Sequence, residues 1–156
     1  MRKFLFVLVL LGFPLSQLFS ISKIDSLTLL LNKTTDTTKI NVLFELIDLV
    51  IDNDPPKSLK YIEQASEIAK KKSLYIFKGR CLKLKGDYFK KHGDYTQALE
   101  LYHQAVEIFQ KNKAYKFIAS VYNNIGATYV DKGDYQNSAT YLIKSLRIFE
   151  QINDKA

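Results

Sequence analysis

The sequence predicts an all-α protein built from repeated helix hairpins, and three observations support this prediction. Only six Gly and three Pro occur among 156 residues, while 47% of the residues are hydrophobic. Turn segments recur around Asn53, Gly93 and Gly133, which are spaced 40 residues apart. Apolar residues on both sides of each turn follow spacings of three and four, which is the periodicity of a helix face. The composition is therefore sufficient for a helical core.

The charge distribution does not indicate a nucleic-acid partner. The formal net charge is +7, and removal of the first 22 residues, with Arg2 and Lys3, leaves 21 basic and 16 acidic side chains. A nucleic-acid-binding protein concentrates its positive charge on one face or in one run. The longest basic run, at residues 70–72, ends a predicted helix, where lysines complement the helix dipole. We therefore expect a mildly basic protein that binds no nucleic acid.

Residues 1–22 have the organisation of a secretory signal peptide. Arg2 and Lys3 precede an apolar run at residues 4–12, and a more polar stretch follows, with small residues just before Lys23. The apolar run is shorter than the roughly 20 residues that a membrane helix needs. We expect cleavage, with an uncleaved anchor as the alternative. The sequence predicts export to the periplasm or cell envelope, with membrane contact only through this segment or a missing C-terminal part.

Each turn combines a residue that ends one helix with an acid that begins the next. Gly93 and Gly133 tolerate the left-handed backbone that commonly closes a helix, and Asn53 adopts it more readily than most residues. The acids that follow these residues are Asp54, Asp94 and Asp134. Aspartate is a good N-cap, because its carboxylate accepts a hydrogen bond from a free amide of the first helical turn.

A helix is predicted on each side of every turn, and the two helices are named A and B in chain order. Helix A repeats one apolar face, made of Val42, Leu46 and Leu49, of Leu82, Gly86 and Phe89, and of Tyr122, Gly126 and Tyr129. Helix B repeats another, made of Leu59, Ile62, Ala65 and Ala69, of Leu99, Tyr102, Ala105 and Phe109, and of Ala139, Leu142, Ser145 and Phe149. Residues 39–156 thus form three repeats, at about 39–78, 79–118 and 119–156. A single hairpin cannot bury its face, so we expect the repeats to stack.

Small residues recur at equivalent positions of these helices. Gly86 and Gly126 occupy helix A, while Ala98 and Ala105 occupy helix B. Glycine inside a helix costs about 1 kcal/mol relative to alanine. We therefore expect these positions to let two helix backbones approach closely.

The two ends of the predicted stack differ. Residues 23–38 are expected to form a capping helix and a linker, which would cover the apolar helix A at residues 40–51. After the last helix B no closing helix follows, so Phe149 and its apolar neighbours are expected to be exposed. We expect either that the sequence is the N-terminal part of a longer protein or that it caps itself as a dimer.

The repeat resembles the tetratricopeptide repeat. The third unit matches it in Tyr122, Ile125, Gly126 and Tyr129, followed by Gly133, Asp134 and Tyr135, and the second in Leu82, Gly86, Phe89, Ala98, Tyr102 and Ala105. The resemblance covers about residues 39–150 and implies a right-handed superhelix of antiparallel helix hairpins. The repeat is longer than the usual length of about 34 residues. The departures are Leu46 in the glycine position, Ser138 and Ser145 in alanine positions, and the lack of a closing proline.

In this family the A helices line a concave groove that binds protein or peptide partners. The matching positions here are Lys83, Asp87, Lys90, Lys91, Asn123, Asn124, Ala127, Val130 and Asp131. Asn123 and Asn124 form the most specific pair, because an Asn side chain both donates and accepts, and so satisfies a peptide backbone of any sequence. The alternative is that these are solvated helix positions. Lys83 and Lys90 would favour an acidic partner, but the first repeat lacks the polar residues of a carboxylate clamp, which we do not assign.

No residue pattern for catalysis, metal binding or a cofactor is found in the sequence. His92 and His103 lack the spacing of metal ligands, and Cys81, the single cysteine, is expected to be a core thiol. Phosphate loops and hydrolase motifs are absent. The sequence therefore predicts a binding scaffold outside the cytoplasm, without catalytic activity or cofactor. The alternative is the input region of a longer signal-transduction protein, such as a histidine kinase or a transcriptional regulator.

Overall fold

The computed structural model of the chain describes residues 15–153. Most of the predicted signal peptide, residues 1–22, lies outside the described residues. The chain divides into two compact units, which meet in the sequence between Tyr61 and Ile62. Across the described residues there are only helices and turns, so the predicted all-α fold class is confirmed. None of these helices has the length and apolar character that crossing a membrane requires.

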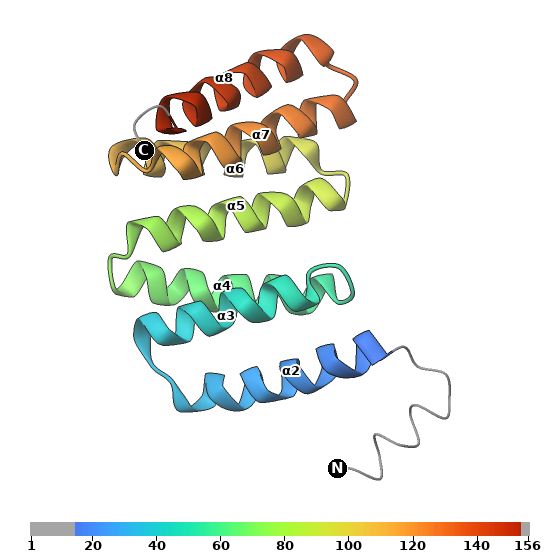
Figure 1. Cartoon of the computed structure of the whole chain (residues 1–156), viewed down its shortest axis with the longest axis vertical. Helices are drawn as coiled ribbons and strands as arrows, with labels where there is room; N and C mark the ends of the chain where they lie inside the picture. Colours follow the sequence, from blue (N-terminus) through green and yellow to red (C-terminus); the bar gives the residue numbers. More distant parts are fainter. Residues whose placement is uncertain (1–14, 154–156) are drawn as a thin grey trace. The chain divides into compact units, whose positions relative to one another are not determined.

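The described helices follow one another with short connections (Figure 1). They are α2 (Leu15–Lys33), α3 (Asp36–Val50), α4 (Pro55–Lys71), α5 (Tyr75–Lys91), α6 (Tyr95–Lys111), α7 (Tyr115–Asp131) and α8 (Tyr135–Asn153). In the second unit α5 and α6 form one hairpin, α7 and α8 form the next, and α6 packs against α7. The hairpins predicted for the second and third repeats are therefore present, with α5 and α7 as A helices and α6 and α8 as B helices.

The first unit contains the helix expected at residues 23–38. This helix, α2, already begins at Leu15 and packs against α3, on which Leu27 and Leu31 are buried. The side chains of Ile40, Leu43, Leu46 and Ile47 in α3 have no exposed surface. A helix with apolar residues on several sides is expected to be buried on several sides, and α3 agrees with that expectation.

The turns of the second unit share one backbone geometry that recurs every 20 residues. Ser73, Gly93, Lys113 and Gly133 have positive φ angles between 53° and 80°. In each case the amide of the next residue donates to the carbonyl five residues earlier, as in the bond from Asp94 N to Phe89 O of 3.0 Å. This closure is a Schellman motif. It explains why helices α5 and α7 begin at Tyr75 and Tyr115, a few residues before the predicted repeat boundaries at 79 and 119.

Asn53 differs from the prediction made for it. Its φ angle is not positive, and the amide of Asp54 donates instead to Val50 O, four residues earlier, at 2.7 Å. The first turn is therefore closed without a left-handed residue. The three acidic caps form as predicted, because the side chains of Asp54, Asp94 and Asp134 accept the amides of Lys57, Gln97 and Asn137 at 3.1, 3.0 and 3.0 Å.

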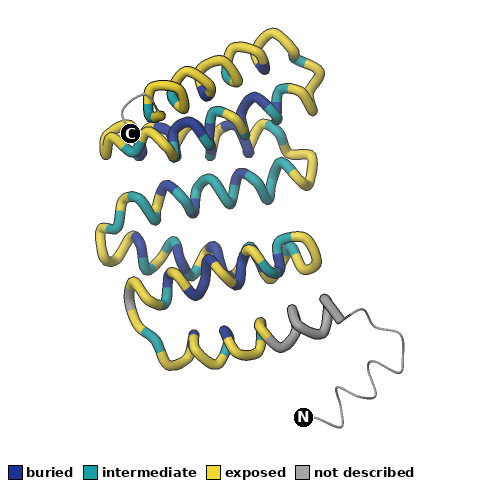
Figure 2. The backbone as a smooth tube through the Cα atoms, viewed as in Figure 1, coloured by how far each residue is buried: buried dark blue, intermediate teal, exposed yellow. Residues whose placement is uncertain are grey.

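The core of the second unit lies between α5, α6, α7 and α8. Tyr102 and Phe109 of α6 are its largest fully buried side chains. Figure 2 shows the buried positions concentrated on α6 and α7, while most of α8 is exposed. On α8 the side chains of Leu142, Ile143, Leu146 and Phe149 are 38–56% exposed. The predicted exposure of Phe149 is therefore confirmed, since no helix within residues 15–153 covers this face of α8.

The helix glycines make room mainly for large side chains of the facing helix. A Cβ atom at Gly86 would lie 2.6 Å from Cε1 of Tyr102, and one at Gly126 would lie 2.8 Å from Cδ2 of Leu142. Gly79 makes the same kind of space for Phe109, at 2.6 Å. The expected close approach of two backbones is found at Gly126, where a Cβ atom would also lie 3.3 Å from the backbone oxygen of Ser138, whereas at Gly86 the nearest atoms belong to the Tyr102 ring.

We predict that Gly86→Ala destabilises the protein more than Gly126→Ala does. At Gly86 the obstructing ring of Tyr102 is fully buried, and overpacking of this kind costs about 1–3 kcal/mol, which exceeds the helix propensity gained. At Gly126 the obstructing Leu142 is 38% exposed, so it has room to move towards solvent, and the backbone oxygen of Ser138, at 3.3 Å from the added Cβ, needs to shift only slightly. Urea unfolding, monitored by circular dichroism, measures the free energy of unfolding of both variants. Equal stability of the two variants would contradict this explanation.

Candidate binding groove

A hollow of about 540 Å³ lies at one end of helices α5 and α7. It is lined by Asp87, Lys90, Lys91, Tyr95, Asn124 and Asp131. These residues come from the last turns of α5, the first residue of α6 and the C-terminal half of α7. Five of the nine residues predicted for the groove are thus brought together, namely Asp87, Lys90, Lys91, Asn124 and Asp131. We name this hollow the α5–α7 groove.

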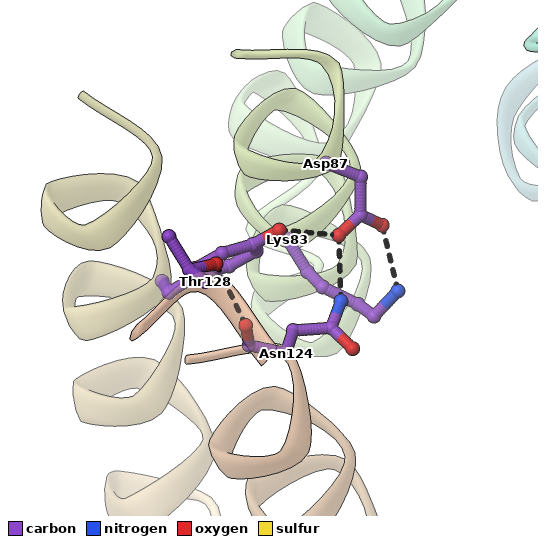
Figure 3. A network of polar contacts seen from close by, with 5 residues as sticks. Lys83, Asp87, Asn124 and Thr128 are labelled. Carbon is purple, nitrogen blue, oxygen red and sulfur yellow. Dashed lines mark hydrogen bonds and ion pairs between the residues drawn. The ribbon is translucent and has the colours of Figure 1, made fainter. Parts of the chain in front are cut away.

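The carboxylate of Asp87 is the centre of the polar contacts beside the groove (Figure 3). Its Oδ1 atom accepts hydrogen bonds from the Tyr102 hydroxyl of α6 and from Nδ2 of Asn124 of α7, both at 2.6 Å. Its Oδ2 atom accepts from Nζ of Lys83, one turn earlier on α5, at 2.8 Å. One carboxylate therefore connects three helices that belong to two successive hairpins.

The protonation of Tyr102 agrees with its role as a donor. Burial raises the pKa of its phenol, and the negative charge of Asp87, which accepts its proton in a hydrogen bond, raises this pKa further. The phenol therefore stays protonated at any physiological pH. A buried Tyr hydroxyl requires a polar partner, and Asp87 supplies it.

The structure gives Asn123 and Asn124 separate roles. The side-chain amide of Asn124 is held by Asp87, while its backbone carbonyl accepts a second bond from the Thr128 hydroxyl at 2.7 Å. Asn123 is exposed on the same helix and does not line the hollow. Of the predicted pair, Asn124 thus joins α7 to α5 beside the groove, whereas the donor and the acceptor of the Asn123 side chain are available to another molecule.

The charges of the groove are mostly compensated. Nζ of Lys90 lies 3.3 Å from Oδ2 of Asp131, so an ion pair joins α5 to α7. Lys83, which is not part of the lining, is paired with Asp87. Two of the cations that suggested an acidic partner therefore face carboxylates of the protein itself. This balance gives no support to a strongly acidic ligand.

The remaining predicted residues, the half-buried Ala127 and the exposed Val130 of α7, do not line the hollow. The sequence prediction in turn missed Tyr95 and the donor Tyr102. Tyr102 was assigned to helix packing because its spacing fits an apolar face. The signal that could have identified it is the phenol itself, since a hydroxyl at a core position must find a partner.

Comparison with known proteins agrees with this geometry at the level of the fold. A sequence model of the tetratricopeptide repeat matches residues 118–155, which include most of α7 and all of α8. No curated protein matches the sequence significantly.

Three solved structures are similar to the chain. The apo form of RapI has 19% identity and a TM-score of 0.66, over 75% of this chain and 43% of that one. Aspartyl phosphate phosphatase F from Bacillus subtilis has 20% identity and a TM-score of 0.72, over 77% and 32%. BtubC from P. vanneervenii has 16% identity and a TM-score of 0.66, over 86% and 56%. The chain therefore matches about a third to just over half of the length of each of these proteins, and at such identities the likeness shows the fold alone.

The chain therefore contains a tetratricopeptide repeat at residues 118–155, within an all-α fold of helix hairpins. The family model identifies the repeat in the hairpin of α7 and α8, and the structural likeness extends the same fold over most of the chain. The predicted resemblance to this family is confirmed.

Proposed function

We propose that the protein is a scaffold that binds an extended segment of another protein or a peptide in the α5–α7 groove. The observation that carries this proposal is the junction at Asp87, where Tyr102 and Asn124 fix α6 and α7 against α5 beside the groove. A binding surface that is already ordered loses less conformational entropy when its partner binds. The same junction leaves the exposed amide of Asn123 available on α7.

Recognition of the partner's backbone suits the chemistry of the groove. The Asn123 amide lies on the exposed surface of α7, outside the lining of the groove. It is able to donate to the carbonyl and to accept from the amide of a peptide that extends beyond the groove. The side chains of the Lys90 and Asp131 pair are 28% and 42% exposed, and an ion pair of that exposure contributes little stability. A partner can therefore exchange this pair for contacts of its own. Since the lining is electrically balanced, we propose a partner of mixed polarity and not a strongly acidic one.

We assign no catalytic activity to this site. Asp87 accepts three hydrogen bonds, which occupy the positions that a general base would need. Tyr102 is held protonated beside it. These groups position helices, and we infer no chemical step from them.

We further propose that the protein acts outside the cytoplasm, in the periplasm or cell envelope. The support for this location is the arrangement of basic, apolar and small residues over positions 1–22. Protease-protection and fractionation experiments on cells that make the protein test it. Recovery with the cytoplasmic fraction at full length would refute the proposed location.

The groove is tested by photo-crosslinking from position 123. A photoreactive residue at Asn123 is expected to capture one discrete partner, whereas the same residue at Asn41, an exposed Asn of α3, is expected to capture none. Asn123→Ala should weaken binding of that partner about fivefold, since one hydrogen bond contributes about 1 kcal/mol, and should leave stability unchanged. Asn124→Ala should lower both the affinity for the partner and the stability of the protein, because Asp87 loses a hydrogen-bond donor. Identical capture from positions 123 and 41 would exclude the groove.

The exposed face of α8 supports a second interaction, which we propose to be pairing with a second copy of the chain. Four large apolar side chains lie on this one helix, and such a patch is typical of a contact surface. A two-fold arrangement brings the same face of both copies together.

We predict that Leu146→Lys turns a dimer into a monomer in size-exclusion chromatography with light scattering. The matched control is Leu29→Lys on α2, where the leucine is even more exposed, at 65% against 56% for Leu146. This control should remain dimeric. A monomeric unaltered protein at high concentration would contradict pairing. That result would favour the alternative in which the chain is the input region of a longer signal-transduction protein whose further helices cover α8.

A further inference from the structure

A second hollow, of about 270 Å³, lies between α4 and α5 within the second unit. It is lined by Ile62, Glu63, Ser66, Glu67, Lys70, Cys81, Leu82 and Lys85. None of these residues lines the α5–α7 groove. A ligand of this hollow is therefore independent of the partner proposed above.

The hollow exists because the repeats differ in sequence at this junction. The residues 40 positions after Ser66, Cys81 and Lys85 are Val106, Val121 and Ile125. These three aliphatic side chains are buried and belong to the core between α6 and α7. At the α4–α5 junction the equivalent residues are Ser66, Cys81 and Lys85. The space that aliphatic side chains fill at the α6–α7 junction is therefore left open at the α4–α5 junction.

The walls of the hollow combine an apolar floor with charges of both signs. Ile62 and Cys81 are buried, and the half-buried Leu82 adjoins them. At the rim Nζ of Lys85 lies 3.8 Å from Oε1 of Glu63, which is a weak, exposed pair. Glu67 and Lys70 are exposed and form no salt bridge within the described residues. Because they are three positions apart on one helix, they are neighbours on its surface.

We propose that this hollow binds a small zwitterion with an apolar body, of the kind represented by a free aliphatic or aromatic α-amino acid. The side chain lies on the floor of Ile62, Cys81 and Leu82. The ammonium group faces Glu67, and the carboxylate faces Lys70. Small-molecule sites typically combine such an apolar lining with a few polar groups that orient the ligand, and the opposite charges at the rim match the two charges of the ligand.

Cys81 provides a reporter at the floor of the site. It is the single cysteine of the chain, and burial raises the pKa of its thiol to about 12. The thiol therefore reacts slowly with alkylating reagents, since only the thiolate is nucleophilic. A ligand seated above it is expected to slow this reaction further, whereas a ligand bound in the α5–α7 groove is not.

Isothermal titration calorimetry with L-leucine and L-phenylalanine tests the site. At least one of the two is expected to bind the purified protein. N-acetyl-L-leucinamide, which lacks both charges, and glycine, which lacks the apolar body, should each bind about tenfold more weakly or not at all. Saturation with the bound amino acid should slow alkylation of Cys81 several-fold.

Two variants assign the binding to this hollow. Ser66→Val introduces the residue that fills the equivalent position of the α6–α7 junction and should abolish binding. Glu67→Gln removes one rim charge from an exposed position, where loss of folding is not expected, and should weaken binding about tenfold. The matched control is Glu107→Gln, which changes the equivalent exposed residue of α6 and should leave binding unchanged. Lack of binding by both amino acids at millimolar concentration, or equal binding by Glu67→Gln and Glu107→Gln, would overturn the proposal.

Discussion

The hydrogen bonds that converge on Asp87 are the constraint on which the arrangement of α5, α6 and α7 depends. A carboxylate that is partly removed from water requires partners, and here the partners come from two other helices as well as from its own. Tyr102 reaches Asp87 only because Gly86 leaves room for its ring. Gly86, Tyr102 and Asp87 thus act together, and Asn124 connects them to the next hairpin. The same contacts define the geometry of the adjacent groove.

The repeats share a backbone plan, but the side chains at their junctions differ. In the next hairpin the glycine equivalent to Gly86 is Gly126, which faces the aliphatic side chain of Leu142 and not a tyrosine ring. At the α4–α5 junction, Ser66 and Cys81 stand where aliphatic residues fill the core of the next junction. One repeated fold therefore carries a polar groove at one place, a small amphipathic hollow at another and an exposed apolar face on α8. Stacked repeats allow this variation, because each contacts mainly its neighbours.

The sequence predicted the features that depend on local chemistry. The acidic caps and the left-handed glycines follow from residue types within a few positions, and both were found. Ser73 and Lys113 adopt the same backbone without being typical of it, because the Schellman hydrogen bonds of the helix ends hold them there, and no local pattern revealed this. The positions of Asp87 and Asn124 were predicted, but their mutual bond joins residues 37 positions apart. Its existence depends on how α5 meets α7, which the periodicity of either helix alone does not define.

A double-mutant cycle between Asp87 and Asn124 tests the central claim most directly. If Asp87 holds α7 through the Asn124 amide, Asn124→Ala should destabilise the unaltered protein by about 1–3 kcal/mol and should cost almost nothing when Asp87→Ala is already present. The difference is the coupling energy of the pair, and directly bonded residues typically give about 0.5–3 kcal/mol. An equal cost of Asn124→Ala in both backgrounds, measured by urea unfolding, would contradict the role given to Asp87.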